Sequence, residues 1–271
     1  MSRVVVGMSG GVDSAVTAYL LKCAGYDVIG ITLKTWISDD GEKNRCCEID
    51  DAAMTADIIG IPYYVRSYTD EFRKCVVNPF IDDYLRARTP NPCVICNETI
   101  KWRGLLKAAD DMGAEYVATG HYASVVQLDN ARYSVVQATH IKKDQTYMLY
   151  RLSQEQLART LMPLGGLSKD EVRQIAVKAG LPVADKPDSQ EICFVTDGHY
   201  TDFIEENTWE KLPPEGDFIG PDGAIVGRHR GIHHYTLGQR KGLGVALGRP
   251  VFIREISPAE NRIYLSDEED I

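Results

Sequence analysis

The sequence predicts an α/β fold: a doubly wound parallel sheet, followed by a helical extension and a small β-rich domain. Three observations predict it. Apolar strand-like runs alternate with segments of helical periodicity through the first half of the chain. Glycines and polar residues follow several of these runs, and after Pro213-Pro214 short glycine-rich β-like runs replace the alternation. Alternating strands and helices are typical of parallel sheets, which bind ligands outside the carboxyl ends of their strands.

The first elements form a β-turn-α-β unit, expected to be right-handed. Three valines enter a glycine-bearing turn, and apolar residues then recur at helical spacing up to Cys23, with Gly25 placed to end the helix. A second strand covers residues 28–33. The pattern then predicts a helix over 50–59, a strand at 63–65, helices over 70–86 and 99–112, and a strand at 116–119.

From Ser153 the pattern becomes helical. We expect a helix over 154–161 and another that begins at Ser168, whose spacing to Glu171 is that of a capping box, and ends near Gly180. Later β-like runs are 224–226, 235–237 and 251–256. With the boundary placed within 206–214, the first domain covers residues 1–209 and the β-rich domain covers residues 210–271.

Composition limits the class of protein. The 271 residues are 44% hydrophobic, enough for a sizeable core, and no apolar run approaches the roughly 20 residues that span a bilayer. We expect a cytoplasmic protein with no membrane partner, in which the 7 cysteines are thiols, metal ligands or catalytic groups. The net charge of -9 argues against a protein that coats nucleic acid by charge alone, but allows a local basic groove.

The turn after the first strand predicts an ATP site. Its glycines let the backbone approach a phosphate, its serines donate hydrogen bonds, and the following helix favours an anion at its N-terminus. There is no GxxxxGK[ST] lysine, and Asp13 beside phosphate requires a divalent cation, expected to be Mg²⁺. Leu33 and Gly120 end other strands at the same edge. The predicted ATP-binding residues are Gly7, Met8, Ser9, Gly10, Gly11, Val12, Asp13, Ser14, Leu33 and Gly120. The turn resembles that of the PP-loop pyrophosphatases, which implies cleavage between the α- and β-phosphates and transfer of AMP to an oxygen.

Two cysteines lie in a proline-framed segment that is expected to be a stiff loop before a helix. Near a helix N-terminus a thiol becomes more acidic, so Cys93 and Cys96 suit nucleophilic or metal-binding roles. A lone CxxC is compatible with redox chemistry, zinc, an iron–sulfur cluster or none of these. Cys193, before Phe194, adds a third thiol, which taken alone is more simply a core residue. Cys46-Cys47 is more simply explained by packing than by sulfur handling.

Several motifs in order resemble the tRNA-specific 2-thiouridylase family. They are SGGVDS, the end of the second strand, the Cys46-Cys47 pair, TPNPCVICN, ATGHYA, Lys143-Asp144-Gln145, SQEICF and GQRKGLG. The resemblance implies that tRNA is the partner and that the C2 oxygen of uridine 34 is adenylated and replaced by sulfur. It assigns catalysis to Cys96, Cys193 and Asp13. It assigns tRNA contact to Asn91, Pro92, Cys93, Lys143, Asp144 and Gln145.

The sulfur chemistry is left with two versions. In one, Cys193 carries a persulfide whose terminal sulfur attacks C2, and Cys96 forms a disulfide with Cys193. In the other version, Cys93, Cys96 and Cys193 hold a [4Fe–4S] cluster with one open iron. We prefer this version, because this chain has a cysteine at position 93, where many family members have Asp. The sulfur donor is expected to be a cysteine desulfurase, a sulfur carrier protein or free sulfide.

Further residues have a functional and a structural interpretation. His121 either lines the ATP pocket or bonds a carbonyl or caps a helix. Positive charge gathers in the small domain, where Arg240 and Lys241 are predicted to grip tRNA phosphates, although solvated charge is the usual explanation. The members of this group are Arg228, Arg230, His233, His234, Arg240 and Lys241.

Two other classes fit parts of the sequence. Another AMP-forming PP-loop enzyme, an amidating synthetase or a tRNA cytidine thiolase, would share the glycine turn but would not need both cysteine motifs. A zinc-dependent RNA-binding module would share the cysteines but would not need the turn. Longer family members continue into a further β-barrel, which this sequence lacks, so we expect activity with weaker RNA affinity or with contacts supplied by another subunit.

Overall fold

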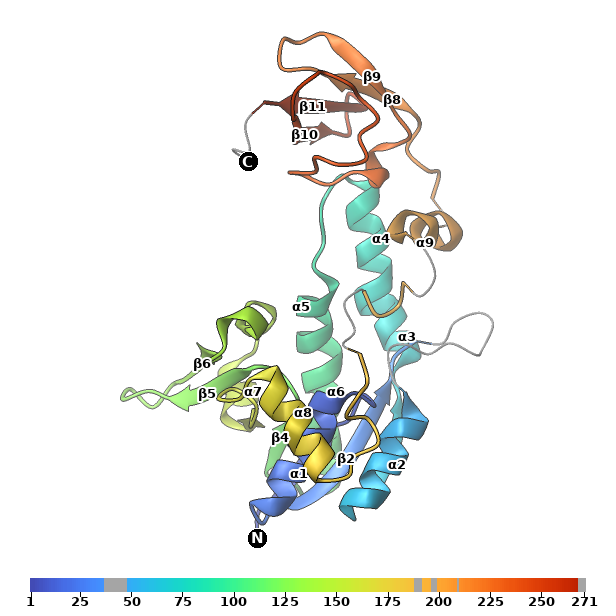
Figure 1. Ribbon diagram of the computed structural model, residues 1–271. Helices are drawn as coiled ribbons and strands as arrows, with labels where there is room; N and C mark the ends of the chain where they lie inside the picture. Colours follow the sequence, from blue (N-terminus) through green and yellow to red (C-terminus); the bar gives the residue numbers. More distant parts are fainter. Residues whose placement is uncertain (37–47, 188–191, 196–198, 209, 268–271) are drawn as a thin grey trace. The chain divides into compact units, whose positions relative to one another are not determined.

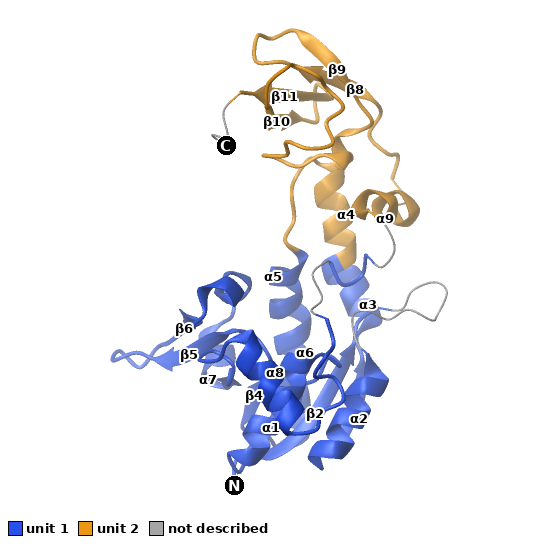
Figure 2. Cartoon of the chain, in the orientation of Figure 1, with its two compact units in different colours: residues 1–76, 92–196 blue, residues 77–91, 197–271 orange. Residues whose placement is uncertain are grey.

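The chain folds into two compact units (Figure 2). The computed structural model describes residues 1–36, 48–187, 192–195, 199–208 and 210–267, so Cys46 and Cys47 lie outside the described residues. Unit 1 comprises Met1–Val76 and Pro92–Thr196, and unit 2 comprises Val77–Asn91 and Asp197–Ile271. Unit 2 therefore takes an early segment of the chain, which the sequence pattern assigns to the first domain.

Unit 1 is built on a five-stranded parallel sheet (Figure 1), so the predicted α/β fold is confirmed. The strand order is β3-β2-β1-β4-β7, and each neighbouring pair is parallel. The strands are β1 (Arg3–Gly7), β2 (Asp27–Lys34), β3 (Tyr63–Ser67), β4 (Tyr116–Ala118) and β7 (Thr160–Leu161). The helix expected over 154–161 is wrong at its end, because α7 stops at Ala158 and the next residues pair with β4.

Both faces of the sheet are covered by helices, as strand β1 illustrates. Its alternate side chains point to opposite faces. Val5 packs in a cluster with Trp102 and Leu105, whereas Val4 packs with Ala18 and Ala56. The covering helices are α1 (Val12–Cys23), α2 (Ile49–Ile59) and α6 (Arg103–Asp111), while α8 (Lys169–Lys178) packs on α1. Strands buried on both faces explain why the valine run is continuously apolar.

Two long helical segments contain π-helical turns. The first runs through α3 (Thr69–Phe72), η1 (Arg73–Val77) and α4 (Asn78–Leu85). The second runs through α5 (Pro92–Cys96), η2 (Asn97–Trp102) and α6. The expected loop that presents two cysteines before a helix is therefore wrong: the helix begins at Pro92, since the first turn of a helix tolerates proline. Cys93 and Cys96 lie inside this first turn.

A two-stranded hairpin extends from unit 1, formed by β5 (Ala123–Gln127) and β6 (Tyr133–Gln137). The short turns η3 (Ile141–Lys143) and η4 (Thr146–Met148) follow it. The hairpin was not predicted, because it carries serines and half-exposed valines instead of a clear alternation. It brings residues 123–148 back toward the core cluster, where Leu149 is buried.

Unit 2 holds a mixed four-stranded sheet of order β10-β11-β8-β9, which confirms the β-rich region. Its strands are β8 (Gly216–Ile219), β9 (Ile225–His229), β10 (Phe252–Ser257) and β11 (Arg262–Ser266). Helices α4 and α9 (Tyr200–Asn207) and the 3-10 turn η5 (Ile232–His234) complete it, with Tyr84 stacked on Tyr200 at 4.5 Å. The run 235–237 is not a strand. Among the described residues, no helix combines the length and apolar character needed to cross a membrane.

Candidate active site

The glycine turn after β1 is locked by its own serines. The Ser14 hydroxyl accepts a hydrogen bond from the Ser9 backbone N–H at 3.1 Å and donates to the Gly11 carbonyl at 3.0 Å. Gly10 has a φ of +82°, and a side chain there would collide with the Glu48 carbonyl. Met8 and Val12 are buried, so neither side chain is exposed to a ligand. The turn is thus held in one shape before any ligand arrives.

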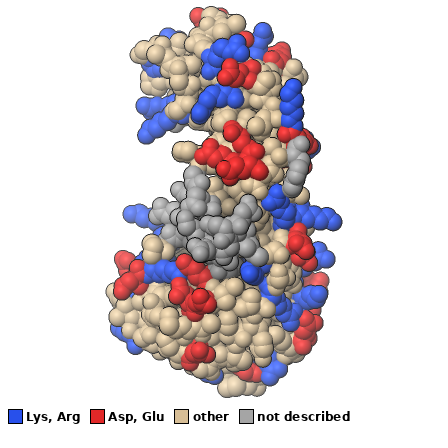
Figure 3. Space-filling view, turned by 90° about the vertical axis from the view of Figure 1, so that its right-hand side faces the viewer, with Lys and Arg blue, Asp and Glu red and all other residues tan. Residues whose placement is uncertain are grey.

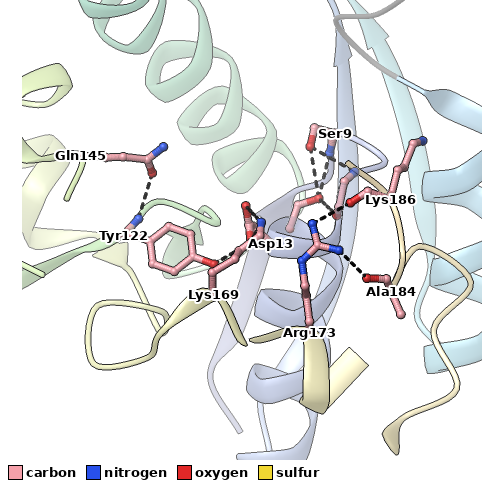
Figure 4. Close-up of polar contacts among 10 residues, drawn as sticks. Ser9, Asp13, Tyr122, Gln145, Lys169, Arg173, Ala184 and Lys186 are labelled. Atoms are coloured by element: carbon pink, nitrogen blue, oxygen red, sulfur yellow. Dashed lines mark hydrogen bonds and ion pairs between the residues drawn. The ribbon is translucent and has the colours of Figure 1, made fainter. Parts of the chain in front are cut away.

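Asp13 is the most strongly bonded side chain of the turn (Figure 4). The Nζ of Lys169 lies 2.7 Å and 2.9 Å from the two carboxylate oxygens, and the Tyr122 hydroxyl donates to Oδ1 at 2.8 Å. The Lys169 side chain is 12% exposed and that of Asp13 is 33% exposed. Sequence reasoning found no lysine for this loop, because Lys169 lies 156 residues away from Asp13. The Ser168 capping box was the available signal, since it sets the start of the helix that carries Lys169.

A second lysine contacts the same turn. The Nζ of Lys186 donates to the Gly10 carbonyl at 3.3 Å and pairs with Asp51 and Glu48. Arg173 of α8 holds this segment by donating to the carbonyls of Ala184 and Lys186 at 3.2 Å and 3.0 Å. Helix α8 and the loop after it therefore bring two ammonium groups to a turn that has no lysine of its own.

The other two predicted ATP residues lie at the same edge of the sheet. A side chain at Gly120 would come within 2.8 Å of the Asp13 and Ser14 backbone, so the strand end after β4 meets the start of α1. Leu33 ends β2, but its side chain is buried in the core beside Trp102. The Leu33 side chain is therefore part of the core and is not presented to a ligand.

His121, next to Gly120, is buried, and its Nδ1 lies 2.9 Å from the Thr119 hydroxyl. Burial, with a smaller contribution from Lys101, lowers the pKa of His121 to about 3. The imidazole is therefore neutral at physiological pH.

The cysteines approach this edge from two directions. Helix α6 leads directly into β4, which is parallel to β1, so α6 runs antiparallel to these strands and the start of α5 lies toward their carboxyl ends. Cys93 and Cys96, three residues apart on α5, lie on one side of the helix, with Cys96 buried and Cys93 half-buried. Cys193 is half-buried in a turn that Phe194 anchors against Phe72 and against Trp36, which follows β2.

The three sulfurs do not form a mononuclear metal site. Within the described residues, the one group of at least three His, Cys, Asp or Glu ligand atoms lying within 4.8 Å of one another is found in unit 2. A [4Fe–4S] cluster attaches each thiolate to a different iron, so it does not need three thiolates around one ion.

The segment Lys143-Asp144-Gln145 is tied to the glycine turn. The Gln145 side-chain oxygen accepts the Tyr122 backbone N–H at 3.0 Å, and the Tyr122 hydroxyl bonds Asp13. Asp144 accepts the Ala138 N–H at 2.8 Å and the Thr146 hydroxyl at 2.5 Å. Burial raises the pKa of Asp144, but these hydrogen bonds lower it more, so the pKa stays below its usual value. Two of these predicted tRNA contacts therefore shape the segment, while Lys143 is exposed.

The basic group in unit 2 is smaller than predicted. His233 is buried, and His234 has only 11% of its side chain exposed. Burial lowers the pKa of both imidazoles, so neither is a surface charge at neutral pH and their inclusion was wrong. Arg228 faces Asp217 at 3.7 Å. Arg240 and Lys241 are exposed in a loop that Gln239 braces by donating to the Lys241 carbonyl at 2.9 Å. On the face of unit 2 that Figure 3 turns toward the viewer, Lys and Arg side chains lie alongside acidic ones.

Comparison with known proteins identifies the family. The chain matches the tRNA methyl transferase HUP domain over residues 2–197 and the tRNA methyl transferase PRC-barrel domain over residues 201–267. It is 52% identical to the tRNA-specific 2-thiouridylase MnmA of Lachnoclostridium phytofermentans, covering 100% of this chain and 78% of that protein. The chain belongs to the tRNA-specific 2-thiouridylase family. The MnmA of Acetivibrio thermocellus is 50% identical, covering 99% of this chain and 77% of that protein.

One solved structure that matches this 2-thiouridylase family member is distant in sequence. The U34-tRNA thiolase NcsA from Methanococcus maripaludis with its [4Fe–4S] cluster is 20% identical, with a TM-score of 0.44 over 76% of this chain and 63% of that one. At this level of similarity, nothing about that cluster transfers to the present chain.

Proposed function

We propose that the protein forms 2-thiouridine in tRNA, by adenylating the C2 oxygen of uridine 34 and replacing it with sulfur. The observation that carries the proposal is the meeting of Asp13, Lys169 and Tyr122 at the glycine turn of a chain 52% identical to a 2-thiouridylase. The domain matches are described as methyl transferases, but methyl transfer uses no pyrophosphate-binding turn. An AMP-forming reaction does, since the turn supplies backbone N–H groups for the departing phosphates.

The chain's own residues suit the activation step. The C2 oxygen of uracil is a poor leaving group until it carries AMP, and the negative charge that develops on pyrophosphate needs cations. Lys169 and Lys186 are both within reach of the turn, so we infer that they neutralise the phosphates when ATP displaces their present partners. Asp13 is the carboxylate that would hold Mg²⁺, which supplies further charge neutralisation when bound.

Cys96 and Cys193 are the proposed sulfur-handling pair. In the relay, a terminal persulfide sulfur on Cys193 attacks C2, and AMP leaves with the C–O bonding electrons. The Cys96 thiolate then attacks Sγ of Cys193, which breaks the S–S bond and leaves sulfur on C2. The resulting Cys96–Cys193 disulfide is returned to two thiols by an external thiol reductant.

Cys93 favours a different use of the same residues, and we propose that Cys93, Cys96 and Cys193 hold a [4Fe–4S] cluster. Two of these thiols share one side of α5 near its N-terminus, where thiolates are favoured, and the donor set leaves one iron open. When bound, such a cluster presents an inorganic sulfide to the activated base. Iron and sulfide analysis after anaerobic purification tests this, and full thiolation by metal-free Cys93→Ala protein would favour the relay.

The activity itself is tested with unmodified tRNA, ATP, Mg²⁺ and a sulfur source. We expect 2-thiouridine by nucleoside mass spectrometry, with AMP and pyrophosphate as the other products. Release of ADP, or thiolated cytidine in place of uridine, would assign the chain to another reaction. Asp13→Asn serves as the inactive control, because it keeps the side-chain shape but removes the charge.

Binding of tRNA is proposed to use Arg240 and Lys241. Neither side chain has an acidic partner within 4.0 Å among the described residues. Changing both to Ala is expected to weaken tRNA binding and to flatten its salt dependence, by about one unit of log K per log salt for each phosphate that the variant no longer neutralises. Arg228→Ala is the control, because this arginine already faces Asp217 at 3.7 Å and Glu215 at 3.9 Å. Equal salt slopes for both variants would remove Arg240 and Lys241 from the interface.

A further inference from the structure

Two histidines and a glutamate converge in unit 2, outside the proposed active site. His233 and His234 end the 3-10 turn η5, and Glu205 lies on helix α9. The Nε2 atoms of His233 and His234 lie 3.4 Å and 3.1 Å from the same carboxylate oxygen of Glu205. One donor atom from each of the three residues lies within 4.8 Å of the others. The described chain holds no other group of this kind.

The spacing of these donor atoms matches the coordination of a small divalent cation. Zinc binds imidazole nitrogen at about 2.0–2.1 Å and carboxylate oxygen at about 2.0–2.2 Å, and in a tetrahedron these lengths place ligand atoms roughly 3.3 Å apart. The two measured nitrogen–oxygen separations, 3.4 Å and 3.1 Å, are those of two tetrahedron edges. A cation can therefore enter with little movement of the side chains.

His229, in the same sequence motif, is bonded in a way that forbids this role. Its Nδ1 accepts the Gly231 backbone N–H at 3.2 Å, so the ring proton is on Nε2, which donates to the Asn261 carbonyl at 3.1 Å. By contrast, the Nδ1 atoms of His233 and His234 are buried and accept no hydrogen bond from any described residue. The Nε2 atoms instead face the Glu205 carboxylate, which accepts their ring protons, and a cation can take the place of each proton as it moves to Nδ1.

Exposure differs across the group in a way that leaves one side open. The His233 side chain is 2% exposed, that of His234 is 11% exposed, and that of Glu205 is 40% exposed. Gly231 makes the close approach of the turn possible, since a side chain there would lie 2.6 Å from the His233 ring. Three protein ligands with solvent access on the glutamate side leave a fourth position for water.

We propose that His233, His234 and Glu205 form a binding site for a divalent transition-metal cation of the Zn²⁺ type. The site lies within unit 2, so it is separate from Cys93, Cys96 and Cys193 of unit 1. Its cation joins helix α9 to the turn η5, from which the chain continues into the loop of Arg240 and Lys241. The role that follows is structural: the metal fixes the start of the loop proposed to contact tRNA.

The test titrates Zn²⁺ into the chelator-treated chain of 271 residues by calorimetry. The parent is the chain in which Cys93, Cys96 and Cys193 are serine, so that their thiols take no zinc. We expect Glu205→Gln and His234→Gln each to weaken one site by more than the roughly 10–100-fold seen when only an orienting residue is removed. The control is His140→Gln, an exposed histidine of unit 1 that pairs with Glu171 at 3.8 Å, and it should bind like the parent.

X-ray absorption of the zinc-loaded parent supplies an independent result. Two imidazoles and otherwise oxygen ligands are expected, and a spectrum with sulfur ligands or without imidazole would overturn the proposal. Equal zinc affinity of Glu205→Gln and His140→Gln would overturn it too, and would leave a carboxylate hydrogen-bonded by two imidazoles. If His234→Gln does not fold, Glu205→Gln still decides the matter, because its side chain is 40% exposed.

Discussion

The proposed active site has an ATP-binding part, the phosphate half, and a cysteine-bearing part, the sulfur half. Different forces hold these two halves in place. At the phosphate half, Asp13, Lys169 and Lys186 are fixed by ion pairs and hydrogen bonds around a locked glycine turn. At the sulfur half, the turn of Cys193 is anchored by Phe194, whose ring lies 5.7 Å from that of Phe72 and 6.2 Å from that of Trp36. Charge fixes the activating groups, whereas aromatic packing positions the sulfur-bearing turn. A substitution in the sulfur half should therefore impair thiolation while the activation of uridine by ATP continues.

The largest expected effect comes from Cys193→Ser, which removes the thiol and leaves the phosphate half intact. Formation of 2-thiouridine should fall below detection, while tRNA-dependent exchange of pyrophosphate into ATP persists. Nucleoside mass spectrometry and radiolabel exchange measure the two steps. Cys23→Ser, at an exposed thiol at the end of α1, is the matched control. Normal thiolation by Cys193→Ser would remove this residue from the chemistry.

Lys169→Met is expected to lower exchange and thiolation together, because both need the activated base. Loss of a preorganised charge at a reacting group costs about 10²–10³-fold in rate. Lys178→Met, at the exposed far end of the same helix, should change neither step. If Lys169→Met lowered thiolation alone, the lysine would belong to the sulfur half and the division of labour would be wrong.

A smaller and more selective effect is expected from Phe194→Ala. Truncation of this buried ring costs about 3–5 kcal/mol of stability and releases the Cys193 turn, so thiolation should fall relative to pyrophosphate exchange. Leu157→Ala, in the core of the same unit, costs about 2–5 kcal/mol but touches neither half. An unchanged ratio of the two steps in Phe194→Ala would show that packing does not position the sulfur.

The smallest effect is expected from the ionisation of His121, and it is an effect on folding stability. Its folded pKa of about 3 is below the ordinary 6.5, so the unfolded chain binds more protons between these values. Stability from this residue is complete above about pH 6.5 and is lost as the pH falls toward 3, at about 1.4 kcal/mol per pH unit. Denaturant unfolding of His121→Asn should show a flatter pH dependence than that of the exposed control His140→Asn. If the two variants showed the same pH dependence, the His121 imidazole would take up protons as readily in the folded state as in the unfolded state.

Much of the sheet could be predicted because its inner strands are continuous apolar runs. The ends of these strands placed Gly120 beside Asp13 correctly, since parallel strands share a carboxyl edge. Strand β7 was missed because two residues carry no periodicity, and its Thr160 is positioned by a hydrogen bond from the distant Trp102. The hairpin was missed because its faces are only partly buried.

The residues of the candidate site also divide into those that a local motif predicts and those that it does not. Local chemistry revealed the glycine turn and the CxxC, but Lys169 and Tyr122 reach Asp13 across 156 and 109 residues of sequence. No spacing rule reports an ion pair between such distant residues. The histidines of unit 2 looked like surface charge for the same reason, since burial against a helix far along the chain cannot be seen in the sequence of one turn.

The bond between Gln145 and Tyr122 has a consequence for the order of events. The Gln145 amide holds the Tyr122 backbone, and the Tyr122 hydroxyl holds Asp13, so the segment assigned to tRNA and the carboxylate assigned to Mg²⁺ share one connector. A ligand that moves one end changes the free energy of occupying the other, and this influence is equal in both directions. We therefore expect tRNA binding at Gln145 to change the affinity of Asp13 for Mg²⁺ through Tyr122, and Mg²⁺ to change the affinity for tRNA by the same factor.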